Sequence, residues 1–247
     1  MCDSTHVLIP VAVLQSESIS DALVDLFSSV DITLLGYHEL PDQTATDQAR
    51  TQYNNRIQRR LASYATLFEA AEGSVTTRSA FTHDAQTTIE RIAIETDVTA
   101  ILLPNPAPEI NNLLLPIRGG TNLDQLTTTT ATVVDGTDAG VILFHAAHSE
   151  PAAAEGQALL ATAAEKLQDA GVDAERITSR TAVTPRPVAA IASAADDAEL
   201  VVLGERKPSL VDRIFGEIPD RVAQATDSPV LVVRKPLAEA EAGGESE

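Results

Sequence analysis

The sequence predicts an α/β protein made of two similar units, each a parallel sheet covered by helices. Between residues 6 and 103, short aliphatic runs alternate with amphipathic helical stretches, the βαβαβαβ order typical of such sheets. The same order restarts near residue 110. It closes with a strand, a loop, a helix and a strand over 200–235, where the 25 residues from 204 to 228 suit a crossover helix rather than a hairpin.

The first half is expected to supply four strands. Each is an aliphatic, β-branched run, whereas the intervening helices carry apolar residues three and four positions apart, as at Ile57, Leu61 and Tyr64. The expected strands are His6–Val13, Asp31–Leu40, Val75–Phe81 and Ala100–Leu103, and the expected helices run from about Ile19 to Phe27, Gln48 to Glu72 and His83 to Asp97.

The second half repeats this order and extends it. Leu113–Ile117 resembles Leu8–Val11, since each is aliphatic with a proline near its end, so a tandem repeat is the simplest interpretation. The expected strands are Leu113–Ile117, Val141–His145, Ile177–Val183, Leu200–Leu203 and Pro229–Val233, and the expected helices are Asn122–Thr137, Ala152–Ala170, Val188–Ala195 and Leu210–Thr226.

The first unit is predicted to be truncated. Only nine residues, PNPAPEINN, separate Leu103 from Leu113, and their three prolines exclude a helix. The first unit therefore has no counterpart of the helix and strand that close the second. We predict a truncated unit at 1–109, a complete unit at 110–236, and an acidic disordered tail at 237–247.

Charge and composition exclude several kinds of partner. Acidic residues number 36 against 17 basic ones, and the net charge of −19 repels nucleic acid and anionic membranes. High acidity with 3% aromatic residues resembles salt-adapted, halophilic proteins. Cys2 is the single cysteine, and no apolar run approaches a membrane-spanning length. A reduced, cytoplasmic protein without membrane insertion is expected.

The closing segment resembles the universal stress protein family, whose nucleotide binders carry G-x2-G-x9-G-[ST] at this place. Gly204 matches the first glycine, but Lys207 replaces the second. Gly216 comes one residue early, and Glu217 replaces the hydroxyl residue. The resemblance implies two doubly wound, Rossmann-like units of the adenine nucleotide alpha hydrolase type, the second with strand order 3-2-1-4-5 and the first without strand five.

The resemblance also implies an aspartate after the first strand of a nucleotide-binding unit. Ala12 and Arg118 stand there in this chain, so a second part of an ATP site is missing. Two interpretations of the loop stay open. Glu217 caps a helix and occupies the anion site itself, or Arg206 and Lys207 line a site remodelled for another anion. The candidate nucleotide-binding residues are Arg118, Gly204, Arg206, Lys207, Gly216 and Glu217.

The last strand is predicted to join two copies of the chain. In the family, the fifth strand lies at the sheet edge and pairs with its equivalent in a partner. The resemblance therefore implies an antiparallel homodimer through the edge residues Pro229, Val230, Leu231, Val232, Val233 and Arg234.

No residue constellation suits catalysis or a metal. The five histidines lack zinc-type spacing, and Ser149 has no G-x-S-x-G context. We therefore expect a non-enzymatic regulatory or protective module, with no cofactor, that acts through dimerisation and partner contacts. The alternatives are an ATP- or AMP-binding protein with a remodelled phosphate loop, and a cytosolic regulator of a membrane transporter.

Overall fold

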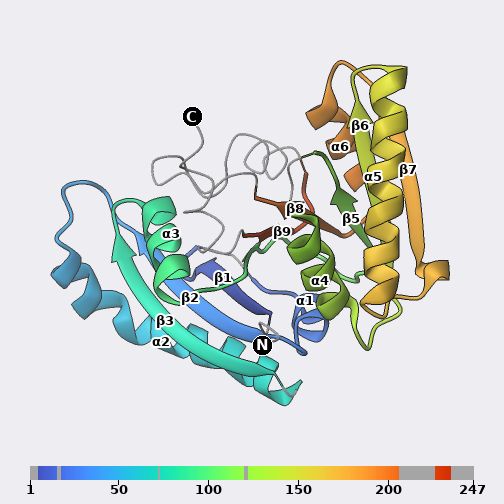
Figure 1. The fold of residues 1–247 in the computed structure, drawn as a ribbon. Coiled ribbons are helices and arrows are strands. Elements are labelled where there is room, and N and C mark those ends of the chain that lie inside the picture. The colour runs from blue at the N-terminus through green and yellow to red at the C-terminus, as the bar shows by residue number, and fades with distance from the viewer. Residues whose placement is uncertain (1–4, 16–17, 72, 120–121, 206–225, 235–247) are drawn as a thin grey trace.

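The strands form one continuous nine-stranded sheet in this computed structural model, which describes residues 5–15, 18–71, 73–119, 122–205 and 226–234. The strand order is β3-β2-β1-β4-β9-β8-β5-β6-β7. Figure 1 shows the two units side by side, with β9 where they meet.

The first unit has the predicted four strands in the order 3-2-1-4. All its internal pairs are parallel. Its elements are β1 (His6–Ala12), α1 (Asp21–Leu26), β2 (Asp31–Glu39), α2 (Thr46–Ala70), β3 (Ser74–Thr82), α3 (Ala85–Glu95) and β4 (Ala100–Leu103). The chain then passes directly to the second unit, without a fifth strand, as its prolines predict.

The second unit has the predicted order 3-2-1-4-5, read as β7-β6-β5-β8-β9. Its pairs are also parallel. Its elements are β5 (Asn112–Pro116), α4 (Leu123–Val134), β6 (Gly140–Ala147), α5 (Glu150–Asp169), a 3-10 turn (Ala174–Arg176), β7 (Ile177–Val183), α6 (Pro187–Ala195), β8 (Leu200–Gly204) and β9 (Val230–Val233). The predicted helix Leu210–Thr226 lies almost entirely outside the described residues.

The prediction of two separate sheets is wrong, because β9 connects them. This strand pairs in parallel with β8 and antiparallel with β4, in a register that places Ala100 opposite Val233 and Leu103 opposite Val230. The first unit lacks a fifth strand, so the edge of β4 is open to β9 of the same chain. An unpaired strand edge exposes backbone N–H and C=O groups, and this pairing satisfies them.

The same strand was expected at a subunit interface. Val230, Leu231, Val232 and Val233 instead lie inside the sheet, where β8 and β4 take both edges of β9, and Pro229 and Arg234 flank this strand. An antiparallel pairing of β9 was predicted with a second copy of the chain, and the structure instead forms one with β4 of the same chain. The outer strands of the sheet are β3 and β7.

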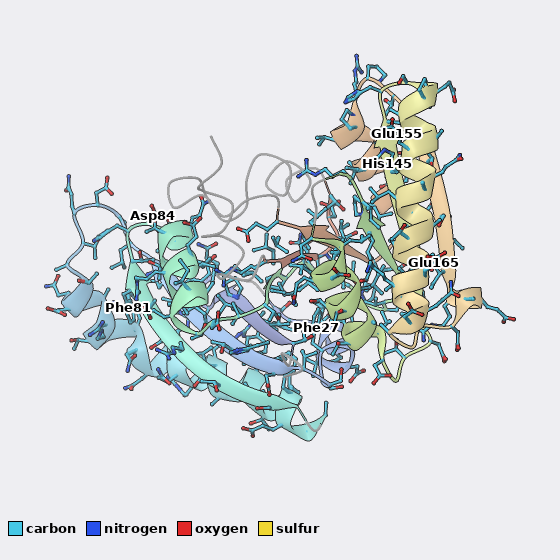
Figure 2. The ribbon with its side chains drawn as sticks, viewed as in Figure 1. Phe27, Phe81, Asp84, His145, Glu155 and Glu165 are labelled. Carbon is cyan, nitrogen blue, oxygen red and sulfur yellow. The ribbon has the colours of Figure 1, made fainter. Side chains whose placement is uncertain are left out.

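The core runs through both units on each face of the sheet. On one face, one buried cluster contains Leu23 of α1, Phe27 directly after α1, Leu126 of α4 and Leu160 of α5. On the other face, Ile89 of α3 and Ile191 of α6 belong to a second cluster that also spans the junction. In Figure 2, Phe27 lies close to α4, where the two units meet. The units thus share their hydrophobic core.

Among the described residues, no helix is both long enough and apolar enough to cross a membrane.

His6, at the start of β1, makes stability depend on pH. Its Nε2 lies 2.9 Å from Thr33 Oγ1, and burial lowers its pKa below the ordinary 6.5, although Asp31 and Asp97 oppose that shift. Below pH 6.5 the unfolded chain binds this proton more readily than the folded one, so stability should fall as pH drops through 6.5. Urea unfolding at several pH values should show this loss, and His6→Gln should flatten it. An unchanged slope in the variant would exclude His6 as the source.

Candidate functional site

The best-placed site lies at the carboxyl ends of β5 and β8. From β5 the chain continues to β6 on one side, whereas β8 lies on the other side of β5. Neighbouring connections leave in opposite directions at such a point, and open parallel sheets bind their ligands there. Two candidate residues predicted from the sequence, Arg118 and Gly204, lie at the carboxyl ends of these two strands.

Arg118 follows β5 at this point, as predicted. It is half-buried and lies two residues beyond Pro116, the last residue of the strand. A cationic guanidinium thus stands at the position where the resemblance implies an aspartate for the nucleotide. This substitution reverses the charge of the site.

His145 on β6 supports the backbone just before Arg118. Its Nδ1 lies 2.8 Å from the carbonyl oxygen of Ile117, the residue that follows β5. Figure 2 labels His145 beside α5, and Gly156 of that helix approaches the ring closely. Sequence patterns alone assign His145 no site role. In the structure its ring lies between Gly156 of α5 and the backbone of Ile117, and it positions the loop after β5.

Gly204 and Glu205 end β8 beside β9. Gly204 is the last residue of β8, opposite Val233. The next residue, Glu205, is only 8% exposed, and its backbone N–H donates to the carbonyl oxygen of Val233 at 2.8 Å. A charged residue after a strand is expected at the surface, so the sequence does not predict the burial of Glu205. The first amide after Gly204 is therefore engaged, and a carboxylate is buried at the entrance to the loop.

Arg234 completes this corner and links it to the first unit. It is 7% exposed, and its Nη1 donates to the carbonyl oxygens of Ala93 and Val98 at 3.0 and 2.9 Å. Burial lowers the pKa of Arg234, while the carboxylates of Glu205 and Asp97 oppose that shift. The residue predicted at a dimer edge thus holds the end of α3 against β9.

Four predicted site residues lie outside the described part of the chain. Arg206, Lys207, Gly216 and Glu217 belong to the segment 206–225. The two interpretations of that loop, a helix cap and a remodelled anion site, therefore stay predictions. Of the six candidates, the structure brings Arg118 and Gly204 to the same end of neighbouring strands.

The corresponding corner of the first unit has no phosphate loop. Ala12 ends β1 and is 2% exposed, and after Leu103 the chain runs through the proline-rich segment to β5. There Asn105 Nδ2 donates to the carbonyl oxygen of Ser228 at 3.2 Å, so this segment contacts the start of β9 instead of forming a helix. The candidate phosphate-loop residues predicted from the sequence all belong to the second unit.

The described residues show no group of three or more His, Cys, Asp or Glu side chains placed to hold a metal ion. His145 points to a backbone carbonyl.

Comparisons with known proteins agree on one family. The model of the Universal stress protein family matches residues 109–234, just over half of the chain. A universal stress protein from Archaeoglobus fulgidus DSM 4304 is similar over 94% of this chain and 96% of its own, with TM-score 0.65 and 14% identity. A putative universal stress protein from Pseudomonas aeruginosa UCBPP-PA14 is similar over 99% of both chains, with TM-score 0.56 and 15% identity. No curated protein matches.

Proposed function

Because this chain belongs to the universal stress protein family, we propose that it is a non-enzymatic regulatory or protective module of the type that does not bind ATP. In this proposal it acts through contacts with partner proteins and with a second copy of itself. The observation that carries the proposal is the buried Glu205 at the end of β8.

The chemistry of this corner disfavours a phosphate. Binding an anion at a strand end requires backbone N–H groups free to converge on it. The N–H of Glu205 already donates to Val233, and its buried carboxylate would repel a phosphate placed at Gly204. The aspartate implied for nucleotide binders is replaced by Arg118 in this unit and by Ala12 in the first.

Nucleotide titration tests the proposal. Calorimetry of ATP and of AMP with Mg²⁺, on the full chain in multimolar KCl, should show no micromolar binding at the second unit. Micromolar binding that Lys207→Ala abolishes would overturn the proposal in favour of a remodelled phosphate loop.

The pairing of β9 constrains the homodimer. Since both edges of β9 are taken, we propose that two copies associate through a surface other than this strand. Light scattering at micromolar concentration and high salt should give twice the chain mass of 26.1 kDa. A monomer under these conditions would remove the homodimer from the proposal.

A further inference from the structure

Strand β7 forms the outer edge of the second unit. In the part of the chain that the structure describes, it pairs only with β6, and Figure 1 shows it at the opposite end of the sheet from β3. Its other side therefore presents backbone N–H and C=O groups that no described strand meets. An edge of this kind can take up a further strand from another chain.

The outward backbone groups of β7 belong to every second residue. Thr184, directly after the strand, donates its N–H to the carbonyl oxygen of Ala147 in β6 at 2.7 Å. Successive residues of a strand turn their N–H and C=O groups to opposite sides, so the odd-numbered residues of β7 turn theirs away from β6. These residues are Ile177, Ser179, Thr181 and Val183.

The side chains of β7 match one another when the strand is reversed about Arg180. On either side of Arg180 stand the hydroxyl residues Ser179 and Thr181, and the ends of the strand are the β-branched, apolar Ile177 and Val183. In an antiparallel pair centred on Arg180, Ser179 would face the partner's Thr181. Ile177 would face the partner's Val183. Hydroxyl and β-branched cross-strand pairs of this kind stabilise antiparallel sheets, so the strand is complementary to itself.

Val183 has an apolar side chain that the chain itself leaves uncovered. It is 47% exposed and is one of three exposed large hydrophobic residues among those the structure describes, with Leu67 and Ile94. Ile177 at the other end of β7 is half-buried and packs against the core. Pairing with a second β7 would cover Val183 with this isoleucine and remove apolar surface from water.

Charge favours β7 over β3 as the edge that pairs with itself. Residues 75–81 of β3 read VTTRSAF where β7 reads ITSRTAV, so Arg78 holds the central position there. Self-pairing places the two central arginines opposite each other, and like charges in that position repel. Arg180 forms an ion pair with Asp197, so each copy of β7 brings its own carboxylate. None of the ion pairs among the described residues includes Arg78, so two β3 strands would lack this compensation.

We propose that two copies of this chain pair through β7, antiparallel and centred on Arg180, so that the sheet continues from one copy into the other. This inference rests on the proposed homodimer and gives it a surface. The two copies are related by a two-fold axis, so each contact occurs twice and each substitution at the strand acts twice.

Hydrogen exchange of the full chain, followed by NMR, tests the backbone pairing. The outward amides of Ser179 and Thr181 should exchange at least about tenfold more slowly where light scattering shows the dimer than at a dilution where it shows the monomer. Exchange at β7 that does not slow in the dimer would overturn the proposal, because no second copy then covers the strand. The edge would be left to an extended segment of another protein.

The matching amides of β3 are the internal control. Thr82 at the end of β3 accepts a hydrogen bond from the N–H of Leu40, so the same alternation turns the N–H groups of Thr77 and Ser79 outward. Their exchange rates should be the same in the dimer and in the monomer. Slowing at β3 in place of β7 would put the interface at the other edge and overturn the proposal.

Val183→Lys tests the side-chain pairing. It places a charge opposite Ile177 twice in the dimer, so the dimer dissociation constant from sedimentation equilibrium should rise at least about tenfold. Ile94→Lys is the matched control, because it makes the same change on α3 at a side chain that is 49% exposed. It should leave the dissociation constant within about twofold of the original. Both side chains are exposed, so both variants should keep the circular dichroism spectrum of the original protein.

The outcomes separate this surface from the homodimer itself. A dimer that Val183→Lys and Ile94→Lys weaken equally, or that neither weakens, would overturn the pairing through β7 and leave the homodimer in place. A monomer at every concentration would remove both the homodimer and its surface.

Discussion

Replacing Gly156 by alanine should destabilise the protein by about 2–4 kcal/mol, although alanine is the better helix former. A Cβ built at Gly156 would lie 2.1 Å from Cδ2 of His145 and 2.6 Å from its Cγ and Nε2. Contacts of this length do not occur between real atoms, so α5 must move away from β6 or the imidazole must turn.

The imidazole is poorly placed to turn. Its Nδ1 is hydrogen-bonded to the Ile117 carbonyl oxygen at 2.8 Å, so rotation would break that bond and release the loop that carries Arg118. Displacing α5 would instead separate Leu160 and Leu167, both buried, from the core. Each route loses interactions that hold the second unit together.

Urea unfolding at constant KCl should measure the loss of unfolding free energy. Thermal unfolding should show a fall in melting temperature of about 5–15 °C for a chain of this size. Gly119→Ala is the control, because a Cβ there meets no atom within 4 Å. In a His145→Ala background, the Gly156→Ala change should cost much less, and a double-mutant cycle would show the coupling. If Gly156→Ala proves neutral or stabilising, the close packing of His145 against α5 is wrong.

Sequence patterns were sufficient to predict the described elements, whereas the strand order within each unit was implied by the family resemblance. Strand and helix periodicities distinguish aliphatic runs such as Leu113–Ile117 from amphipathic helices such as α2, and the three prolines after Leu103 exclude a fifth strand in the first unit. These are local properties. They depend on residues close together in the chain, so sequence reasoning captures them.

The pairing between the units depends on distant residues and was missed. One edge of β4 and one edge of β9 have no partner strand within their own unit. The sequence does not show whether these two edges pair with each other or with a second copy of the chain. Within one chain the two edges are tethered at high effective concentration, so β4 and β9 pair before a second copy can compete. That choice also buries Glu205 and Arg234, two charged residues that would be expected at the surface after the ends of their strands.

Removing the Arg234 guanidinium should be nearly as damaging as the glycine substitution. In Arg234→Met the carbonyl oxygens of Ala93 and Val98 lose a charged donor at the end of α3, and the buried Glu205 loses a nearby positive charge. The variant loses the hydrogen bonds of a buried guanidinium and leaves the Glu205 carboxylate without that nearby cation, so the free energy of unfolding should fall by about 2–4 kcal/mol. The loss should appear in urea unfolding of the whole chain, because both units share the sheet and core.

The control is Arg180→Met, which removes an exposed ion pair with Asp197 and should cost under about 1 kcal/mol. Glu205→Gln in the Arg234→Met background should recover part of the lost stability, since it removes the charge left without its neighbouring cation. Because Arg234 follows β9 and bonds to the end of α3, its loss should also expose the amides of β4 to hydrogen exchange before those of β6. Equal protection of β4 and β6 in the variant would show that the two units stay joined without Arg234, and that β-sheet pairing and the shared core alone hold them.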